Sequence, residues 1–432
     1  MTPDELTRRF FLGCGAATAA GLSVSTARAE PPELTRVLSK LEPYFTPPAE
    51  FQDVSRGTPL PHKLSAAKKR EVGMHRDTWT LEVLSDPDNP ATLGKPLAKK
   101  DGTALDFAAL LALGKTNAVR FAKVMTCLNI GCPLGMGIWE GVPLRDVLWL
   151  TQPKANLRRV FYHGYHNDDP KQLFRSSLPV GRVLEDLDDL PPVILCYKLN
   201  GEWLDSERGG PVRIVVPEAY GFKSVKWLTT VTLSNLAHAN DTYANGNNDI
   251  DSPLKTFAAT LQVPTEIRPN APIPLTGYAQ VGVSGLSKVQ VWIHPLGKPW
   301  PEDDPYFAKA PWTDATILGP PQQWGGKLPG NAIPKDVLGF EAGQPKAWPM
   351  RLAKAHWAVL LPGLPAGEYV LRCRTIDAKK QAQPMPRPFK KSGRCDIEEV
   401  KVLVSALTNS IQPFATHSSS CFVSGSAAPA SY

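Results

Sequence analysis

The chain has 432 residues, of which 42% are hydrophobic and 21% are charged, a composition typical of a globular protein with room for two domains. Its 43 prolines and 33 glycines favour a loop-rich, strand-containing architecture. The formal net charge is +7, yet the basic run Lys68-Lys69-Arg70 is short and typical of a solvated surface. The sequence therefore excludes a nucleic-acid-binding arm and only weakly favours an anionic substrate or an acidic partner.

Residues 1–29 have the parts of an export signal. Arg8-Arg9 precedes an apolar, small-residue stretch that ends near Val24, and Ala27-Arg28-Ala29 forms a cleavage pattern before Glu30. The arginine pair indicates a twin-arginine signal, which exports proteins already folded around a cofactor; a chance Arg-Arg pair is the alternative. We predict a signal peptide over 1–29 and a mature protein in the periplasm.

Residues 30–255 are predicted to form an α+β domain. A Pro-rich lead-in over 31–75 is expected to be extended. Strands are predicted at 78–84, 119–126, 157–162, 193–197, 212–216 and 226–233. Short helices are predicted at 106–111 and 142–150, the second with Pro143 in its first turn.

The composition changes after residue 255. Strand-forming runs separated by turn residues occur at 261–267, 273–283, 289–293, 356–361, 367–375 and 398–404. No helical periodicity intervenes, so residues 256–408 are predicted to form a β-sandwich with an insertion rich in Pro, Gly and Trp at roughly 295–350. Residues 409–432, rich in Ser and Ala, are predicted to be a disordered tail.

The seven cysteines form none of the common paired motifs. Without Cys-x-x-Cys-His, covalent c-type haem is excluded on this chain, and without Cys-x-x-Cys a zinc ribbon or an iron–sulfur cluster is not expected. A redox function would therefore need another kind of cofactor and a separate cytochrome or quinone-linked partner for its electrons.

Three segments carry a family resemblance. The first is Met125-Thr126-Cys127-Leu128-Asn129, followed by Trp139-Glu140-Gly141-Val142-Pro143-Leu144. The second runs from Leu199-Asn200-Gly201-Glu202 through Gly209-Gly210-Pro211-Val212-Arg213-Ile214-Val215-Val216-Pro217 to Tyr220-Gly221-Phe222-Lys223-Ser224-Val225-Lys226-Trp227. A weaker third match is Arg374-Thr375-Ile376-Asp377 with Gln383-Pro384. Together they resemble the sulfite oxidase superfamily of molybdopterin-dependent oxidoreductases.

The resemblance implies a sulfite-oxidase-type molybdopterin-binding domain followed by an immunoglobulin-like β-sandwich that forms a homodimer. Its cofactor would be Mo-molybdopterin. Cys127 would ligate the molybdenum and, with Arg56, form the catalytic part of the site. The residues expected to contact the cofactor are Cys127, Thr58, His166, Arg208, Arg213, Ser224, Val225 and Lys226.

The residue types fit that chemistry. A metal that already carries a dithiolene and oxo groups suits one soft thiolate. The cofactor phosphate needs amides and cations, and residues 220–226 offer a glycine for close backbone approach and two lysines. A lone cysteine after an apolar strand is ordinarily a packing residue. Its place in the motif favours ligation by Cys127, with Cys132 as the rival.

The chain departs from the family at three cofactor-contacting positions. Thr58 stands where the family has histidine, and Arg208 where it has histidine or asparagine. His166 stands where the family has Asp or Thr; a surface histidine among Asn167, Asp168 and Asp169 is the alternative reading of this residue.

Two further departures concern the substrate. Residues 247–250 lack the tyrosine of the sulfite-oxidising branch, and Tyr243 is offset from its place. Residues 282–287 lack that branch's substrate arginine. A sulfite dianion needs several cationic or donor groups around it, so both losses weaken the case for sulfite.

The sequence therefore predicts a periplasmic molybdenum-cofactor oxidoreductase of the oxygen-atom-transfer type with a small-molecule substrate. A sulfite dehydrogenase and a sulfoxide reductase are the alternatives within this class. A cofactor-free binding module is the alternative outside it.

Overall fold

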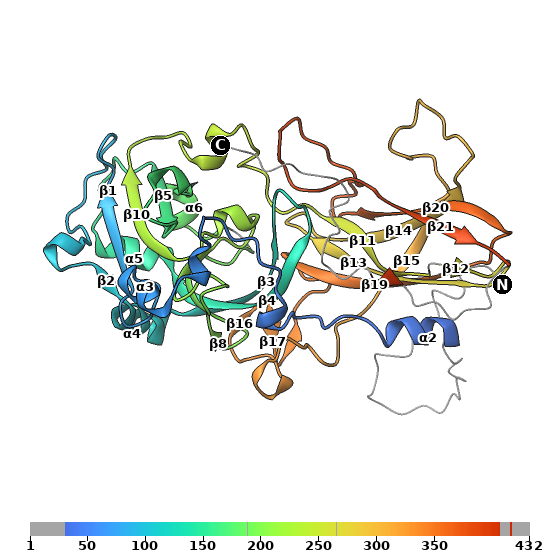
Figure 1. Cartoon of the computed structure of the whole chain (residues 1–432), viewed down its shortest axis with the longest axis horizontal. Helices are drawn as coiled ribbons and strands as arrows, with labels where there is room; N and C mark the ends of the chain where they lie inside the picture. Colours follow the sequence, from blue (N-terminus) through green and yellow to red (C-terminus); the bar gives the residue numbers. More distant parts are fainter. Residues whose placement is uncertain (1–30, 188, 265, 407–414, 417–432) are drawn as a thin grey trace.

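The structure, a computed structural model, describes residues 31–187, 189–264, 266–406 and 415–416 (Figure 1). The predicted signal peptide and nearly all of the predicted tail lie outside these residues. Figure 1 shows a mixed part with two sheets and short helices beside an all-β part. Within the described ranges, no helix has the length and apolarity needed to cross a bilayer.

One mixed sheet of the first part has the strand order β2-β1-β10-β5-β6. Its strands are β1 (Thr80–Ser85), β2 (Leu105–Asp106), β5 (Arg159–Gly164), β6 (Arg175–Pro179) and β10 (Leu228–Ser234). The end of β5 pairs with the start of the antiparallel strand β10, with Gly164 opposite Leu228. His166, just beyond β5, and Lys226, just before β10, therefore lie at the same end of this pair of strands.

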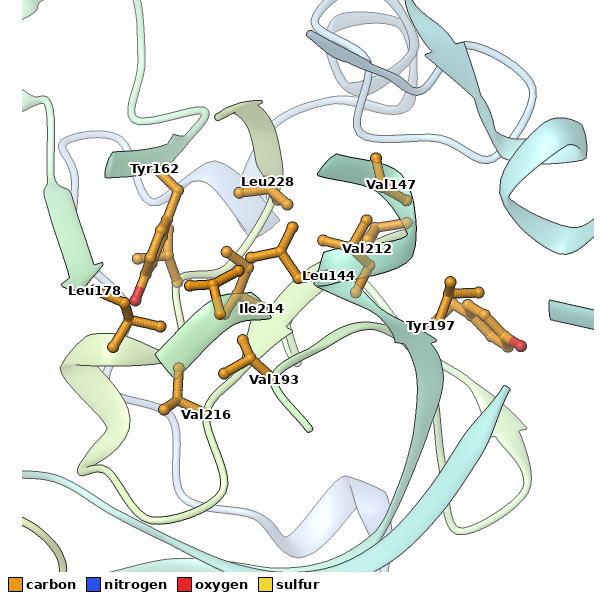
Figure 2. Packing of buried hydrophobic residues seen from close by; sticks show 14 of the residues in the cluster. Leu144, Val147, Tyr162, Leu178, Val193, Tyr197, Val212, Ile214, Val216 and Leu228 are labelled. Atoms are coloured by element: carbon orange, nitrogen blue, oxygen red, sulfur yellow. The ribbon is translucent and has the colours of Figure 1, made fainter. Parts of the chain in front are cut away.

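The second sheet of this part has the order β16-β3-β4-β7-β8, with β9 added on β7. Its strands are β3 (Val119–Thr126), β4 (Pro133–Pro143), β7 (Ile194–Leu199), β8 (Glu202–Trp203), β9 (Arg213–Val215) and β16 (Val337–Leu338). Side chains alternate across β9: Val212, Ile214 and Val216 enter the large core cluster shown in Figure 2. The same alternation turns Arg213 toward the opposite face.

Helices cover the edges of this part. They are α3 (Ala66–Glu71), α4 (Phe107–Asn117), α5 (Leu144–Leu150), α6 (Val180–Leu184) and α7 (Thr242–Asn245). Helix α5 follows Pro143 and buries Leu144, Val147 and Leu148, an i, i+3, i+4 spacing that gives one apolar face. Full burial of each such side chain contributes about 1.5–3 kcal/mol.

The all-β part is one nine-stranded sheet of order β12-β21-β20-β14-β15-β19-β13-β11-β22, antiparallel except at β12. Its strands are β11 (Phe257–Val263), β12 (Glu266–Ile267), β13 (Ile273–Val281), β14 (Lys288–Pro295), β15 (Thr313–Ile317), β19 (Ala353–Leu361), β20 (Gly367–Ile376), β21 (Glu398–Val404) and β22 (Ala415–Thr416). The sheet surrounds its own core around Trp357. This is consistent with the predicted β-sandwich.

Three expectations about local structure were wrong or incomplete. The lead-in over 31–75 contains α2 (Pro32–Leu38) and α3, and α2 packs on β13 and β19 of the all-β part. The longest strand, β4, was not predicted because it carries three glycines and a proline at each end. Gly141 is required there, since a Cβ would lie 2.2 Å from Leu195 O on the neighbouring strand. The predicted insertion at 295–350 contains two strands: β15 pairs with β14 in the all-β part, and β16 pairs with β3 in the mixed part.

The all-β part holds β3 in place just before Cys127. Thr126 Oγ1 donates to Gln280 Oε1 at 2.5 Å, and Gln280 Nε2 donates to Lys255 O at 2.7 Å. Val124 N donates to Leu352 O at 2.8 Å. The end of β3 is thus fixed by both parts of the molecule.

Candidate active site

A cavity of about 340 Å³ opens where β3, β9 and β10 converge. Of the residues predicted to form the site, those that line it are Arg56, Cys127, His166, Arg208, Arg213, Ser224, Val225 and Lys226. They come from four separate stretches of the chain. Thr58 is not among the lining residues.

Cys127 is the first residue after β3 and turns out of the sheet. Gly131 N donates to Cys127 O at 2.9 Å, closing a tight turn that holds the cysteine at the cavity wall. Cys127 is a free, half-buried thiol, whereas the rival Cys132 is buried and disulfide-bonded. Among the described residues, no group of three or more His, Cys, Asp and Glu side chains is arranged to hold a metal. A metal here would have to bring its other ligands with it.

Two buried arginines form an anion-binding wall. Arg213 donates from Nη1 to Arg208 O at 2.8 Å and from Nη2 to Ser224 O at 2.5 Å, and its guanidinium lies 5.4 Å from the Trp139 ring centroid. Burial lowers the pKa of Arg213 to about 10, so it remains charged at neutral pH. The Nε atoms of Arg213 and Arg208 are buried and lack a hydrogen-bond partner within the described part of the chain. Unused charged donors beside a cavity suit an anionic ligand.

Ser224 and Val225 belong to the loop that faces this wall. The Ser224 hydroxyl accepts from Val216 N at 3.1 Å, while its carbonyl accepts from Arg213. Gly209 on the opposite loop has φ +97°, and a Cβ there would lie 2.7 Å from Lys226 Cγ. The backbone at Gly209 therefore approaches Lys226 in a way that no other residue type permits.

Lys226 completes the cationic side of the cavity. Its Nζ donates to Asp53 Oδ1 at 2.8 Å, Ser55 Oγ at 2.8 Å and Glu207 O at 2.7 Å. Burial, reinforced by the charge of Arg213, lowers the pKa of Lys226 to about 8. Burial alone would raise the pKa of Asp53, but the Lys226 ammonium lowers it overall. Asp53 thus balances one of the three cations, and Glu207 pairs with a second, Arg208.

The pKa of Lys226 predicts a pH-dependent affinity for anions. We expect binding of inorganic sulfate to weaken between pH 7.5 and 9.5, because Lys226 loses its charge there while sulfate stays dianionic. In the unfolded chain Lys226 keeps its proton up to about pH 10.5, whereas in the folded protein it loses it near pH 8. Between about pH 8 and pH 10.5, Lys226 by itself therefore makes the free energy of unfolding rise with pH. Titration calorimetry at fixed ionic strength measures the affinity. Lys226→Arg should remove the pH dependence; an equal decline in that variant would contradict the assignment.

His166 is buried, which excludes the surface-histidine alternative. Its Nδ1 lies 3.1 Å from Gly164 O; a carbonyl only accepts, so Nδ1 carries the proton and neutral His166 has its lone pair on Nε2. Burial lowers the pKa of His166, with a smaller contribution from Arg56. His166 is therefore neutral at pH 7.

Arg56 stands at the mouth of the cavity. It is exposed, with its guanidinium 4.9 Å from the centroid of the Phe174 ring. Thr58, two residues on, does not line the cavity, and its backbone exchanges hydrogen bonds with Gln172 at 2.8 and 3.3 Å. The structure thus brings Arg56 to the site and leaves Thr58 outside it.

Tyr243 lines the cavity although the sequence spacing placed it off the pattern. It lies in α7, stacks on Phe222 at 4.5 Å between ring centroids, and donates from Oη to Asn129 Oδ1 at 3.1 Å. Burial raises the pKa of Tyr243, and the nearby Cys127 raises it further. A tyrosine hydroxyl therefore lies beside the cysteine, where counting residues had found none. No local sequence signal marks this position, because it depends on stacking against Phe222.

Cavity, lone thiol and arginine wall together define a site for a large anionic cofactor that carries its own metal ligands. Residues 71–242 match the family of the oxidoreductase molybdopterin binding domain. Residues of the chain are 32% identical over 212 positions to the mitochondrial sulfite oxidase of Drosophila melanogaster, covering 48% of this chain and 33% of that protein. Identity to the NADPH nitrate reductase of Beauveria bassiana is 27% over 162 residues, covering 36% of this chain and 17% of that one.

A solved structure is similar over most of the chain. It is the sulfane dehydrogenase SoxCD from Paracoccus pantotrophus, with a TM-score of 0.54 and 18% identity, covering 89% of this chain and 94% of that one. This likeness concerns the fold. Residues 71–242 therefore resemble the molybdopterin-binding domain found in sulfite oxidases and nitrate reductases, which implies Mo-molybdopterin as the cofactor. The chain spans a third or less of the length of the two curated relatives above.

Proposed function

We propose that the protein is a molybdenum-cofactor oxidoreductase that transfers an oxygen atom to or from a small substrate. The observation that carries the proposal is the pairing of one free thiol, Cys127, with a buried wall of cations in a single cavity. When bound, Mo-molybdopterin would supply the metal and the two-electron redox chemistry. Cys127 would ligate the metal, and Arg208, Arg213 and Lys226 would hold the anionic end of the cofactor, with backbone groups of Ser224 and Val225.

The remaining residues act on the substrate and on protons. Arg56 at the mouth attracts and orients an anionic substrate. The Tyr243 hydroxyl, protonated at neutral pH, donates a hydrogen bond beside Cys127. His166 Nε2, with its free lone pair, can accept a proton released when water supplies the oxygen atom.

The first substrate to test is sulfite. Tyr243 in the cavity restores one of the two groups that the sequence lacks at the expected position, and Arg56 gives one cation. The second candidate is a neutral sulfoxide. It is favoured because residues 282–287 contribute no arginine to the cavity wall.

Molybdenum analysis and dye assays test the proposal. Protein expressed in a cofactor-competent host should contain about one molybdenum per chain, and should reduce ferricyanide with sulfite or oxidise reduced methyl viologen with methionine sulfoxide. Protein from a host unable to make molybdopterin is the control. Molybdenum-free protein from the competent host would refute the proposal and leave the cofactor-free binding module.

We extend the proposal to the location of the enzyme, its dimerisation and its electron carrier. The arginine pair and cleavage pattern before Glu30 support export to the periplasm. The nine-stranded part supports an immunoglobulin-like domain that pairs two copies of the chain, as in the family it resembles. The lack of haem motifs supports an external electron carrier.

Tyr243→Phe tests the role of the hydroxyl. We expect turnover in the dye assay to fall by about 100-fold, the lower end of the 10²–10⁴-fold that a positioned proton donor or acceptor typically contributes. Loss of the bond to Asn129 should cost only about 1 kcal/mol of stability. Steady-state kinetics against pH, with molybdenum content measured in parallel, separate the two effects. Turnover equal to that of the parent would exclude a role for Tyr243 in the reaction.

A further inference from the structure

The connection between β20 and β21 carries a concentrated positive charge. Residues 385–396, here called the basic strap, include Arg387, Lys390, Lys391 and Arg394 within eight positions, against one acidic residue, Asp396. In Figure 1 this connection leaves the all-β part and rises between the two parts of the molecule. Neither the cofactor site nor the substrate groups use it.

The basic strap is anchored to segments that lie next to the cavity-lining residues. Asp249 N donates to Lys391 O at 2.8 Å, and Lys255 Nζ donates to Ser392 O at 2.6 Å. A Cβ on Gly393 would lie 2.3 Å from the ring of Tyr220, the residue before cavity-lining Gly221.

The turn that carries Cys127 touches the same strap. A Cβ on Gly131, one residue after cavity-lining Ile130, would lie 2.3 Å from Arg394 Cβ. The glycine allows the strap to lie directly against this turn. The strap is therefore adjacent to the proposed metal ligand without lining the cavity.

Two of the four cations, Lys390 and Lys391, are free to meet a partner, since Arg387 pairs with Asp249 and Arg394 lies 4.0 Å from Glu398. Lys390 is exposed and Lys391 half-buried, and within the described ranges neither makes an ion pair. Arg387 is anchored by Asp249 at 2.8 Å and lies 5.2 Å from the ring centroid of Phe389, which is 39% exposed. An exposed aromatic ring with an arginine against it is typical of a protein-docking surface, where aromatic and arginine side chains carry most of the binding energy.

We propose that the basic strap is the docking surface for an acidic, one-electron carrier protein. This inference rests on the proposed function. Each turnover exchanges two electrons, and oxidation of a substrate with water also releases two protons; two carrier molecules, each taking one electron, balance the reaction. A protein carrier must bring its redox centre close to the metal. The strap next to the Cys127 turn offers a charged surface at that position, which steers an acidic partner.

Charge reversal tests the proposal in the cofactor-loaded enzyme. Lys390→Glu/Lys391→Glu should lower kcat/KM with acidic soluble cytochrome b5 by about 10-fold or more at low salt, since electrostatic steering changes association rates by about 10–10³. The rate with a small dye should be unchanged. The matched control is Lys99→Glu/Lys100→Glu, an exposed lysine pair on the first part, which should leave both rates at parent values.

The outcomes separate the two proposals. If no dye reaction occurs in any variant, the proposed function fails; binding of cytochrome b5 to the parent but not to the strap variant, measured by titration calorimetry, still tests the surface. Equal rates with cytochrome b5 for parent and strap variant would overturn the docking proposal. So would binding of the parent to phosphatidylglycerol vesicles without binding to cytochrome b5, which would assign the strap to a membrane surface.

Discussion

Cys127→Ser is expected to lower turnover by at least about 100-fold in both dye assays. Groups that merely support a metal ligand cost about 10–100-fold when removed, so loss of the ligand itself should cost as much or more. Serine keeps the size of the side chain but replaces a soft thiolate by a hard oxygen. X-ray absorption at the molybdenum edge should show one sulfur ligand fewer than in the parent.

Cys196→Ser is the matched control for this experiment. Cys196 is also a free, buried thiol, and it belongs to the core cluster against which Cys127 packs, but it does not line the cavity. Its substitution should leave the sulfur count unchanged. An unchanged sulfur count in Cys127→Ser would mean that another group holds the metal, and the site assignment would fail.

Arg213→Met is expected to remove the cofactor and to destabilise the protein. The substitution leaves two buried carbonyls, Arg208 O and Ser224 O, without their donor, at about 1–3 kcal/mol each. It also removes a charge from the anion wall. We expect a loss of about 2–4 kcal/mol in denaturant unfolding of the cofactor-free protein, together with molybdenum and pterin contents near zero.

Arg182→Met separates stability from cofactor binding. Arg182 is also a buried arginine, and it donates to Glu218 at 2.7 and 2.9 Å and to Pro191 O at 2.9 Å. It does not line the cavity. Its loss should cost comparable stability, because Glu218 is left unpaired. Cofactor content should nevertheless stay close to that of the parent. Loss of cofactor from both variants would show that instability alone explains the effect.

Local patterns predicted most strands of this protein because each is an apolar run bounded by turn residues. They failed at β4, where glycines lower strand propensity yet are needed for close strand contact at Gly141. They failed at α2, whose seven residues gain stability from packing on β13 and β19. The short strands β15 and β16 exist only because partners are present in both parts.

The candidate site also contains residues that local patterns predicted and residues that only tertiary packing placed. The Arg213–Lys226 segment was predictable, since a strand, a glycine-containing turn and a second strand put cations on one side by alternation alone. Tyr243 was not, because its place depends on stacking against Phe222 rather than on a count from Lys226. Thr58 shows the converse. Its position in a motif suggested the cavity, but Gln172 holds its backbone elsewhere.

The amino-acid sequence was sufficient for the cofactor class, because the residues that indicate it lie in short motifs whose geometry is set by neighbouring residues. The roles of Cys127 and of the cations in those motifs remain predictions. Which side chains share a cavity was decided by pairing between distant strands. Gly164 opposite Leu228 brings His166 to Lys226, and Thr126 bonded to Gln280 fixes the end of β3. Such contacts follow from burial and strand register across the whole chain, and no local periodicity encodes them.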